Sequence, residues 1–113
     1  MKTFTTVLIF IFTLVFIQSA QADENTMKTG ETVFNHWCAP CHDPGMEHPG
    51  TMALAAKYKG EIEPVLASRT GMTKEFVAQF VREGVSVMPF FRKTEISDTE
   101  LDALSEYLMR NDN

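Results

Sequence analysis

The 113-residue sequence contains only two cysteines and lacks any apolar run long enough to cross a bilayer. Its longest apolar stretch, residues 4–17, falls short of the roughly 20 residues that a membrane-spanning helix needs. Sustained two-residue alternation is absent, which argues against β-strands, and so is any repeat or long linker, which argues against several domains. Basic residues are also few, ten against fifteen acidic ones, which argues against nucleic acid and anionic membranes as partners.

The first 22 residues have the three parts of a secretory signal peptide. Lys2 provides a short positive region, the apolar run 4–17 follows, and residues 20–22 (Ala-Gln-Ala) place small side chains around a cleavage point. The sequence therefore predicts a cleaved signal peptide over 1–22 and a single mature domain over 23–113, with no stable membrane insertion after cleavage. An uncleaved membrane anchor is the alternative. The mature domain keeps nine basic and fifteen acidic residues, a formal charge of −6.

Both cysteines lie in the segment Cys38-Ala39-Pro40-Cys41-His42, which has the spacing of a c-type haem attachment motif. Two thiols three positions apart on one helical turn can each add to a vinyl group on the same porphyrin edge. The imidazole of the next residue can then reach the iron. We therefore predict one covalent haem c attached to Cys38 and Cys41, with His42 as an axial iron ligand.

Two other kinds of site use the same cysteine spacing. A redox dithiol of the thioredoxin kind is expected near a βαβ pattern, which this sequence lacks. Zinc could take Cys38, Cys41 and His42 as three ligands, but the chain has no further cysteine and no second cluster. A predicted signal peptide favours haem, because haem attachment in the bacterial families that this motif resembles follows export. With both sulfurs bonded to haem, no disulfide can form, and the buried porphyrin would stabilise the small domain instead.

Met88 is the predicted second axial ligand, 46 residues after His42. Pro89 follows it, and proline lacks an amide donor and disfavours helix at the preceding residue, so we expect Met88 on an extended loop. A thioether ligand raises the reduction potential of haem iron. With both axial positions filled, the iron has no open position for a substrate, which predicts electron transfer without catalysis.

Other methionines and histidines of the mature chain compete for that position: Met27, Met46, Met52, Met72, Met109, His36 and His48. Met46 lies only four residues from His42, too few at about 3.5 Å per residue to pass around the haem edge. Met52 and Met72 remain alternatives, and His48 would give a bis-histidine haem of lower potential. The others are expected at the surface or in apolar contacts.

The remaining pattern predicts helices only. We expect a first helix from about Lys28 into the haem motif, with apolar Val33, Phe34 and Trp37 at helical spacing, after frayed residues 23–28. Residues 43–50 are expected to form a loop. Further helices are expected over 51–58, from Pro64 over 65–67, and over a segment that contains 76–81. Breaks are predicted at three glycines: Gly60, Gly71 and Gly84.

The last helix has the clearest start signal in the chain. Ser97 and Glu100 have the spacing of a capping box, in which each side chain bonds the other residue's amide. Ile96 and Leu101 are placed as a hydrophobic staple around it. We therefore predict a helix from about residue 98, with Leu104, Leu108 and Tyr107 on or beside one face.

With these residues placed, the chain resembles class I c-type cytochromes over about residues 28–110. The matching parts are the haem motif, the Met88-Pro89 pair, and Gly30-x-x-x-Phe34 on the first helix, with Tyr107 as the facing aromatic on the last. The resemblance implies a small all-α fold of about four to five helices wrapped around one covalent haem. It also implies a proline carbonyl that accepts a hydrogen bond from the ligand histidine. Pro49 is the candidate, closer to His42 than is usual, and Pro44 competes with it.

More narrowly, residues 80–97 (FVREGVSVMPFFRKTEIS) are similar to small periplasmic cytochromes paired with flavoprotein dehydrogenases, of the p-cresol methylhydroxylase and eugenol hydroxylase type. This similarity implies a periplasmic one-electron carrier between a flavoprotein donor and an acceptor such as an oxidase or another cytochrome. Arg92 and Lys93 would then lie near the docking edge, or simply be solvated. The alternative function is a haem-based sensor or small-ligand-binding protein in which Met88 is labile. A peroxidase-like enzyme would instead need a distal histidine or arginine over an open iron, and His48 is the only candidate histidine.

Overall fold

The computed structural model describes residues 23–112, and the predicted signal peptide over 1–22 lies outside the described residues. Residues 23–33 are helical and run directly into a π turn, η1 (Phe34–Cys38), and the short helix α2 (Ala39–His42). Then follow α3 (Pro49–Tyr58), the 3₁₀ turn η2 (Leu66–Ser68), α4 (Lys74–Glu83), α5 (Asp98–Met109) and η3 (Arg110–Asp112). Apart from one isolated bridge between Val85 and Met88, every regular element in the described range is helical. The prediction of an all-α fold is confirmed.

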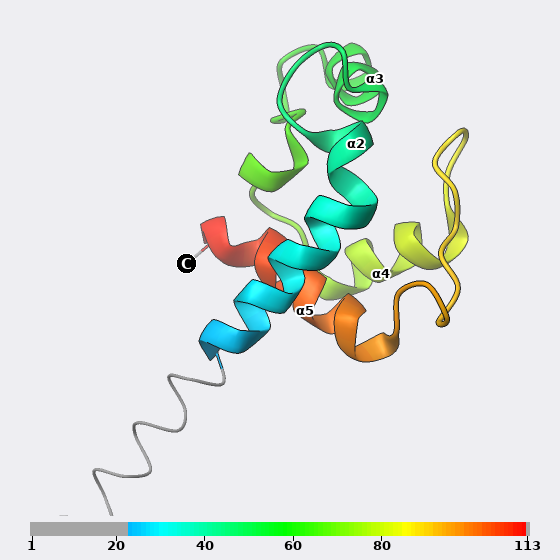
Figure 1. Cartoon of the computed structure of the whole chain (residues 1–113). Helices are drawn as coiled ribbons and strands as arrows, with labels where there is room; N and C mark the ends of the chain where they lie inside the picture. Colours follow the sequence, from blue (N-terminus) through cyan, green and yellow to red (C-terminus); the bar gives the residue numbers. More distant parts are fainter. Residues whose placement is uncertain (1–22, 113) are drawn as a thin grey trace, which may run out of the picture.

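The first helix crosses α5 at Gly30 (Figure 1). A Cβ atom at Gly30 would overlap the carbonyl of Ala103 and lie 2.7 Å from the Cβ of Tyr107, so only glycine leaves room for this crossing. One turn further on, the rings of Phe34 and Tyr107 pack with centroids 5.6 Å apart and planes inclined by 44°. The expected contact of Gly30 and Phe34 with Tyr107 is therefore confirmed.

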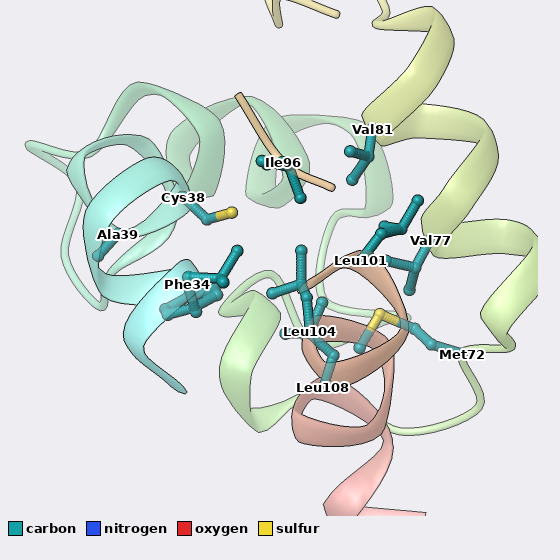
Figure 2. Close-up of a cluster of buried hydrophobic side chains, with 11 residues drawn as sticks. Phe34, Cys38, Ala39, Met72, Val77, Val81, Ile96, Leu101, Leu104 and Leu108 are labelled. Carbon is teal, nitrogen blue, oxygen red and sulfur yellow. The ribbon is translucent and has the colours of Figure 1, made fainter. Parts of the chain in front are cut away.

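The hydrophobic core fills the space between the first helix, α4 and α5 (Figure 2). Ile96 and Leu104 are completely buried at its centre. The sulfur of Cys38 points from the first helix into this cluster (Figure 2). The haem motif therefore begins at the edge of the core, and its first thiol belongs to the buried cluster.

Both long C-terminal helices begin at a side-chain cap. Ser97 Oγ accepts a hydrogen bond from the Glu100 amide at 3.2 Å, and the Glu100 carboxylate accepts one from the Ser97 amide at 2.8 Å. The predicted capping box is thus present, and Ile96 and Leu101 beside it are both buried. At the start of α4 the Thr73 hydroxyl accepts a hydrogen bond from the Phe76 amide at 3.1 Å, a cap that was not predicted from the sequence.

Two of the predicted helix starts were wrong. The first helix is already formed at Asp23, five residues before the expected start, because Glu24, Met27 and Lys28 are all good helix formers. Helix α3 starts at Pro49, which shortens the expected loop to residues 43–48. Proline suits the first helical position because its missing amide has no partner there in any case.

The helix expected from Pro64 is only the single 3₁₀ turn η2. Val65 before this turn and Arg69 after it both have extended backbone angles, so the helix neither reaches back to Pro64 nor continues. Gly71 follows with a φ of 74°, as its predicted role as a break requires. Gly84 likewise ends α4, with a φ of 69°.

The turn before the haem motif is wider than an α-helical turn. The amide of Ala39 donates to the carbonyl of Phe34, five residues earlier, which is the π pattern. Val33 and Phe34 are buried as expected, whereas Trp37 remains 37% exposed and was wrongly expected on the same apolar face. Its ring instead meets the edge of Phe91, with centroids 5.6 Å apart.

Candidate haem-binding site

The three residues of the attachment motif lie on one continuous helical segment. Cys38 ends η1 and is buried, while Cys41 lies on α2 and is exposed, and both are free thiols. Burial, assisted by the neighbouring Cys41, raises the pKa of Cys38 to about 12, so this sulfur is a protonated thiol at neutral pH. The attacking cysteine of a redox dithiol has a lowered pKa, so the raised pKa of Cys38 argues against a redox dithiol at this site.

His42 is half-buried on α2 and its Nδ1 atom is buried without a hydrogen-bond partner. Burial lowers the pKa of His42, which favours the neutral imidazole. A neutral imidazole is the form that binds a metal ion. The residues of the motif therefore fit a covalently attached, iron-containing group: two unbonded thiols are followed directly by a neutral imidazole.

Gly50, in the first turn of α3, seats the imidazole of His42. A Cβ atom at Gly50 would lie 2.6 Å from the carbonyl oxygen of Cys41 and 2.7 Å from Cε1 of His42, so any side chain there would displace the ring or the helix. The loop between α2 and α3 is closed by two further bonds. His48 Nδ1 donates to the Pro40 carbonyl at 3.0 Å, and the Thr51 hydroxyl donates to the Asp43 carbonyl at 2.9 Å.

Within residues 23–112, no group accepts a hydrogen bond from His42 Nδ1, so the expected bond to a proline carbonyl is not formed there. Pro49 is the first residue of α3, where backbone carbonyls point along the helix towards its C-terminal end. The role of Pro49, and that of its competitor Pro44, therefore stays a prediction.

The other candidates for the second iron ligand lie in the core, in contacts of their own or at the surface. Met72 is 5% exposed in the hydrophobic core, and Met109 packs partly buried against it. His48 is hydrogen-bonded within its own loop, and His36 lies edge-on against the Trp37 ring, with centroids 4.7 Å apart. Met46 and Met52 are exposed.

Met88 lies on a tight hairpin that folds back over the end of α4. The amides and carbonyls of Val85 and Met88 bond each other at 2.9 and 3.2 Å, and Ser86 between them has a φ of 53°. A Cβ atom at Gly84 would lie 2.7 Å from the Met88 carbonyl oxygen, so the hairpin needs glycine there both for space and for its positive φ. Met88 is thus on a non-helical turn, as the following proline predicted.

The hairpin tip presents apolar side chains to the surface. Val87 is 91% and Phe90 61% exposed, and Val85 is also exposed. The hairpin stands apart from the helices in Figure 1 (yellow). Arg92 and Lys93, just beyond it, are exposed, but both are paired: Arg92 with Glu95 at 3.3 Å and Lys93 with Asp98 at 2.7 Å.

Within residues 23–112, no three His, Cys, Asp or Glu side chains gather where they could bind a metal ion, so the zinc alternative has no assembled site there. None of the helices in the same range has both the length and the apolar character needed to cross a membrane.

Comparisons with known proteins agree with the motif. The family model described as "Cytochrome C oxidase, cbb3-type, subunit III" matches residues 25–108. Over 95 residues, which cover 84% of this chain and 70% of the relative, the sequence is 28% identical to the 4-cresol dehydrogenase [hydroxylating] cytochrome c subunit of Pseudomonas putida. No solved structure matches the chain.

Proposed function

Because the chain belongs to the cytochrome c family described as cbb3-type cytochrome c oxidase subunit III, it is a haem protein of electron transfer, and we propose that it is a periplasmic one-electron carrier. The resemblance to class I c-type cytochromes is confirmed by this match. We propose a dehydrogenase as the electron donor, since the relative from Pseudomonas putida is the cytochrome subunit of one. The acceptor would be an oxidase or another cytochrome.

The observation that carries the proposal is the arrangement on η1 and α2: two free thiols followed directly by a half-buried imidazole whose neutral form is favoured. Cys38 and Cys41 would hold one haem through thioether bonds, and His42 and Met88 would be its axial ligands. Haem c supplies, when bound, an iron atom that gains and loses one electron. The protein's part is to fix the two ligands, and neither has to move during the reaction.

Each ligand is held by its own packing. Gly50 brings the first turn of α3 against the imidazole of His42, which limits rotation of the ring. The Val85–Met88 turn holds Met88 at the point where the chain reverses. With an imidazole and a thioether both in place, water and small ligands are kept from the iron, which suits electron transfer and opposes catalysis.

The hairpin tip is a suitable docking surface for a redox partner. Its exposed apolar side chains, Val87 and Phe90, belong to the loop that carries the proposed ligand. Arg92 and Lys93 are exposed charges beside this surface, and such charges affect the rate of association more than its strength.

The test is a visible spectrum of the periplasmically expressed protein, oxidised and then reduced. We expect haem that remains attached after denaturation, and a weak far-red band of thioether-ligated ferric iron that disappears in Met88→Ala. Covalent haem without this band in the parent protein would contradict the Met88 assignment and favour a sensor or a bis-histidine site. Retention of the band in Met88→Ala would move the ligand to another methionine, with Met52 and Met72 tested next.

The proposed donor is tested separately, by mixing the oxidised cytochrome with a flavoprotein dehydrogenase reduced by 4-cresol. We expect reduction of the haem at a rate that falls when Phe90 is replaced by serine. Reduction no faster than by free reduced flavin would reject this class of donor while leaving the carrier function intact.

A further inference from the structure

Arg82, near the end of α4, joins three separate parts of the chain around the Met88 hairpin. Its Nη1 atom donates to the carbonyls of Phe91 at 3.1 Å and of Ile96 at 2.8 Å. Its Nη2 atom donates to the carboxylate of Asp98 at 3.0 Å, in the first turn of α5. The Arg82 side chain is only 22% exposed, so its bonds to the two carbonyls are partly shielded from water, whereas the Asp98 carboxylate is 65% exposed.

The carbonyls that Arg82 binds lie at the two ends of residues 91–96, the segment that follows the hairpin and that we call its return path. The chain leaves α4 at Gly84, reverses at Val85–Met88 and comes back to α4 where the Phe91 amide donates to the Val81 carbonyl at 2.7 Å. Arg82 donates to the carbonyl of the same Phe91 and, five residues further on, to the carbonyl of the buried Ile96. Among residues 23–112, the hairpin backbone between these points is held by its own two hydrogen bonds and by its close approach to Gly84.

Phe91 also connects this return path to the helix that carries the haem motif. Its ring meets that of Trp37 at 5.6 Å and 70°, and Trp37 directly precedes Cys38. Phe91 therefore connects the segment that follows Met88 to the helical segment that carries Cys38 and His42. Its carbonyl is fixed by Arg82 and its ring by Trp37.

We propose that Arg82 is a positioning residue for Met88: its guanidinium fastens the return path at Phe91 and Ile96 and so keeps the ligand hairpin closed against the haem. The proposal rests on the proposed ligation by Met88. A guanidinium suits the task, because its planar set of donors can bond two carbonyls and a carboxylate at once, which an ammonium group cannot do in the same geometry. When Arg82 is lost, the hairpin opens more often while the helical core stays folded.

The experiment compares the haem-loaded parent protein with Arg82→Met, Arg82→Lys and a control, Lys74→Met. Lys74 also links α4 to α5, through Asp102 at 2.9 Å and Glu106 at 2.6 Å, but it lies at the opposite end of α4 from the hairpin. Imidazole is titrated into each ferric protein, and its binding is followed by loss of the far-red band. Because imidazole binds only when Met88 is displaced, its apparent affinity reports the fraction of open hairpin.

A hydrogen bond to a charged group changes an equilibrium by roughly tenfold or more, so we expect imidazole to bind Arg82→Met about 10- to 100-fold more tightly than the parent. Arg82→Lys should recover part of the difference, and Lys74→Met should bind like the parent. In guanidinium titrations, Arg82→Met should lose the far-red band well before its helical circular dichroism.

Unchanged imidazole affinity in a folded Arg82→Met protein would overturn the proposal, and so would an equal change in Lys74→Met, which would indicate a general loss of stability. If Arg82→Met fails to fold, the same comparison is made with Arg82→Lys, where parental affinity overturns the proposal. A parent protein without the far-red band would instead reject ligation by Met88 itself, which separates failure of the proposed function from failure of this inference.

Discussion

Replacement of Gly30 by alanine sets two effects of opposite sign against each other. In a helix interior, alanine is more favourable than glycine by about 1 kcal/mol, so helix propensity alone predicts a more stable protein. At Gly30, however, the new Cβ atom would overlap the carbonyl of Ala103 and lie 2.7 Å from the Cβ of Tyr107. Both neighbours are backbone or the base of a side chain, so neither can rotate away, and the two helices must separate.

Overpacking of this kind costs about 1–3 kcal/mol, and a clash with a backbone carbonyl belongs at the upper end of that range. Separation of the helices also loosens the Phe34–Tyr107 ring contact, which contributes about 1 kcal/mol. After the gain in propensity is subtracted, we expect a net loss of about 2–3 kcal/mol. For a domain of this size each kcal/mol lowers the melting temperature by about 4–8 °C, so the expected decrease is about 10–20 °C.

The assay is thermal unfolding of the haem-loaded protein followed by circular dichroism. Glu31→Ala is the matched control, since Glu31 is the exposed neighbour on the same helix and its replacement changes propensity without crowding. The control should melt within about 4 °C of the parent, because surface substitutions usually change stability by less than about 0.5 kcal/mol. A Gly30→Ala protein that melts at or above the parent temperature would refute the argument, because propensity would then outweigh the close approach.

Three further outcomes are expected. Gly50→Ala places a Cβ atom 2.6 Å from the Cys41 carbonyl oxygen and 2.7 Å from Cε1 of the His42 ring. We expect it to lower the free energy of unfolding by about 1–3 kcal/mol and to shift the Soret band. An unchanged spectrum and an unchanged urea midpoint would contradict this expectation. Ser97→Ala removes the cap of α5 and should cost about 1 kcal/mol in urea unfolding, whereas Thr99→Ala, on the exposed side of the same turn, should cost much less. Hydrogen bonds from Ser97 hold the pKa of Glu100 below its ordinary value of 4.5. Lys93 and Arg82 likewise hold the pKa of Asp98 below its ordinary 3.8. The stability that these two carboxylates contribute is therefore present above about pH 4.5 and is lost as the pH falls through and below about 4. Urea midpoints between pH 6 and pH 3 should therefore fall, less steeply in Ser97→Ala, and equal slopes in the two proteins would count against the Glu100 part.

Much of the fold could be predicted because the relevant signals are local. The capping box needs only Ser97 and Glu100 three residues apart, and the break at Gly71 and the end of α4 at Gly84 follow from glycine's tolerance of positive φ. The contact between Gly30 and Tyr107 is not local, and it was predicted through resemblance to class I cytochromes. The structure supplies its physical reason, a backbone approach that admits no Cβ atom.

The errors arose where tertiary contacts override a local pattern. Pro64 can begin a helix, but the chain around η2 is held from outside: the Ala67 carbonyl accepts bonds from Arg110 at 2.8 Å and from Asn111 at 2.9 Å. Trp37 has the spacing of a core residue, yet it lies within a π turn that has no sequence signal, and its ring lies against Phe91 instead.

The site was predictable to a different degree in its two halves. The spacing of Cys38, Cys41 and His42 carries its own chemistry, and the chain places them on one helical segment as that spacing requires. Arg82 could not have been recognised, because an arginine on an amphipathic helix usually lies in solvent. Its partners are backbone carbonyls nine and fourteen residues further along, and any residue type can provide a carbonyl.

The crossing at Gly30 joins residues 73 positions apart, so the first helix and α5 meet only when a long loop of the chain closes. No N-terminal fragment that ends before α5 contains Ala103, Leu104 or Leu108, and such a fragment lacks one whole wall of the core. Until α5 packs against it, the first helix lacks the contacts of Gly30 with Ala103 and of Phe34 with Tyr107 that help to bury it. Because this long-range contact completes the core around Cys38, the Cys38 thiol is easier to reach before the first helix and α5 meet than afterwards.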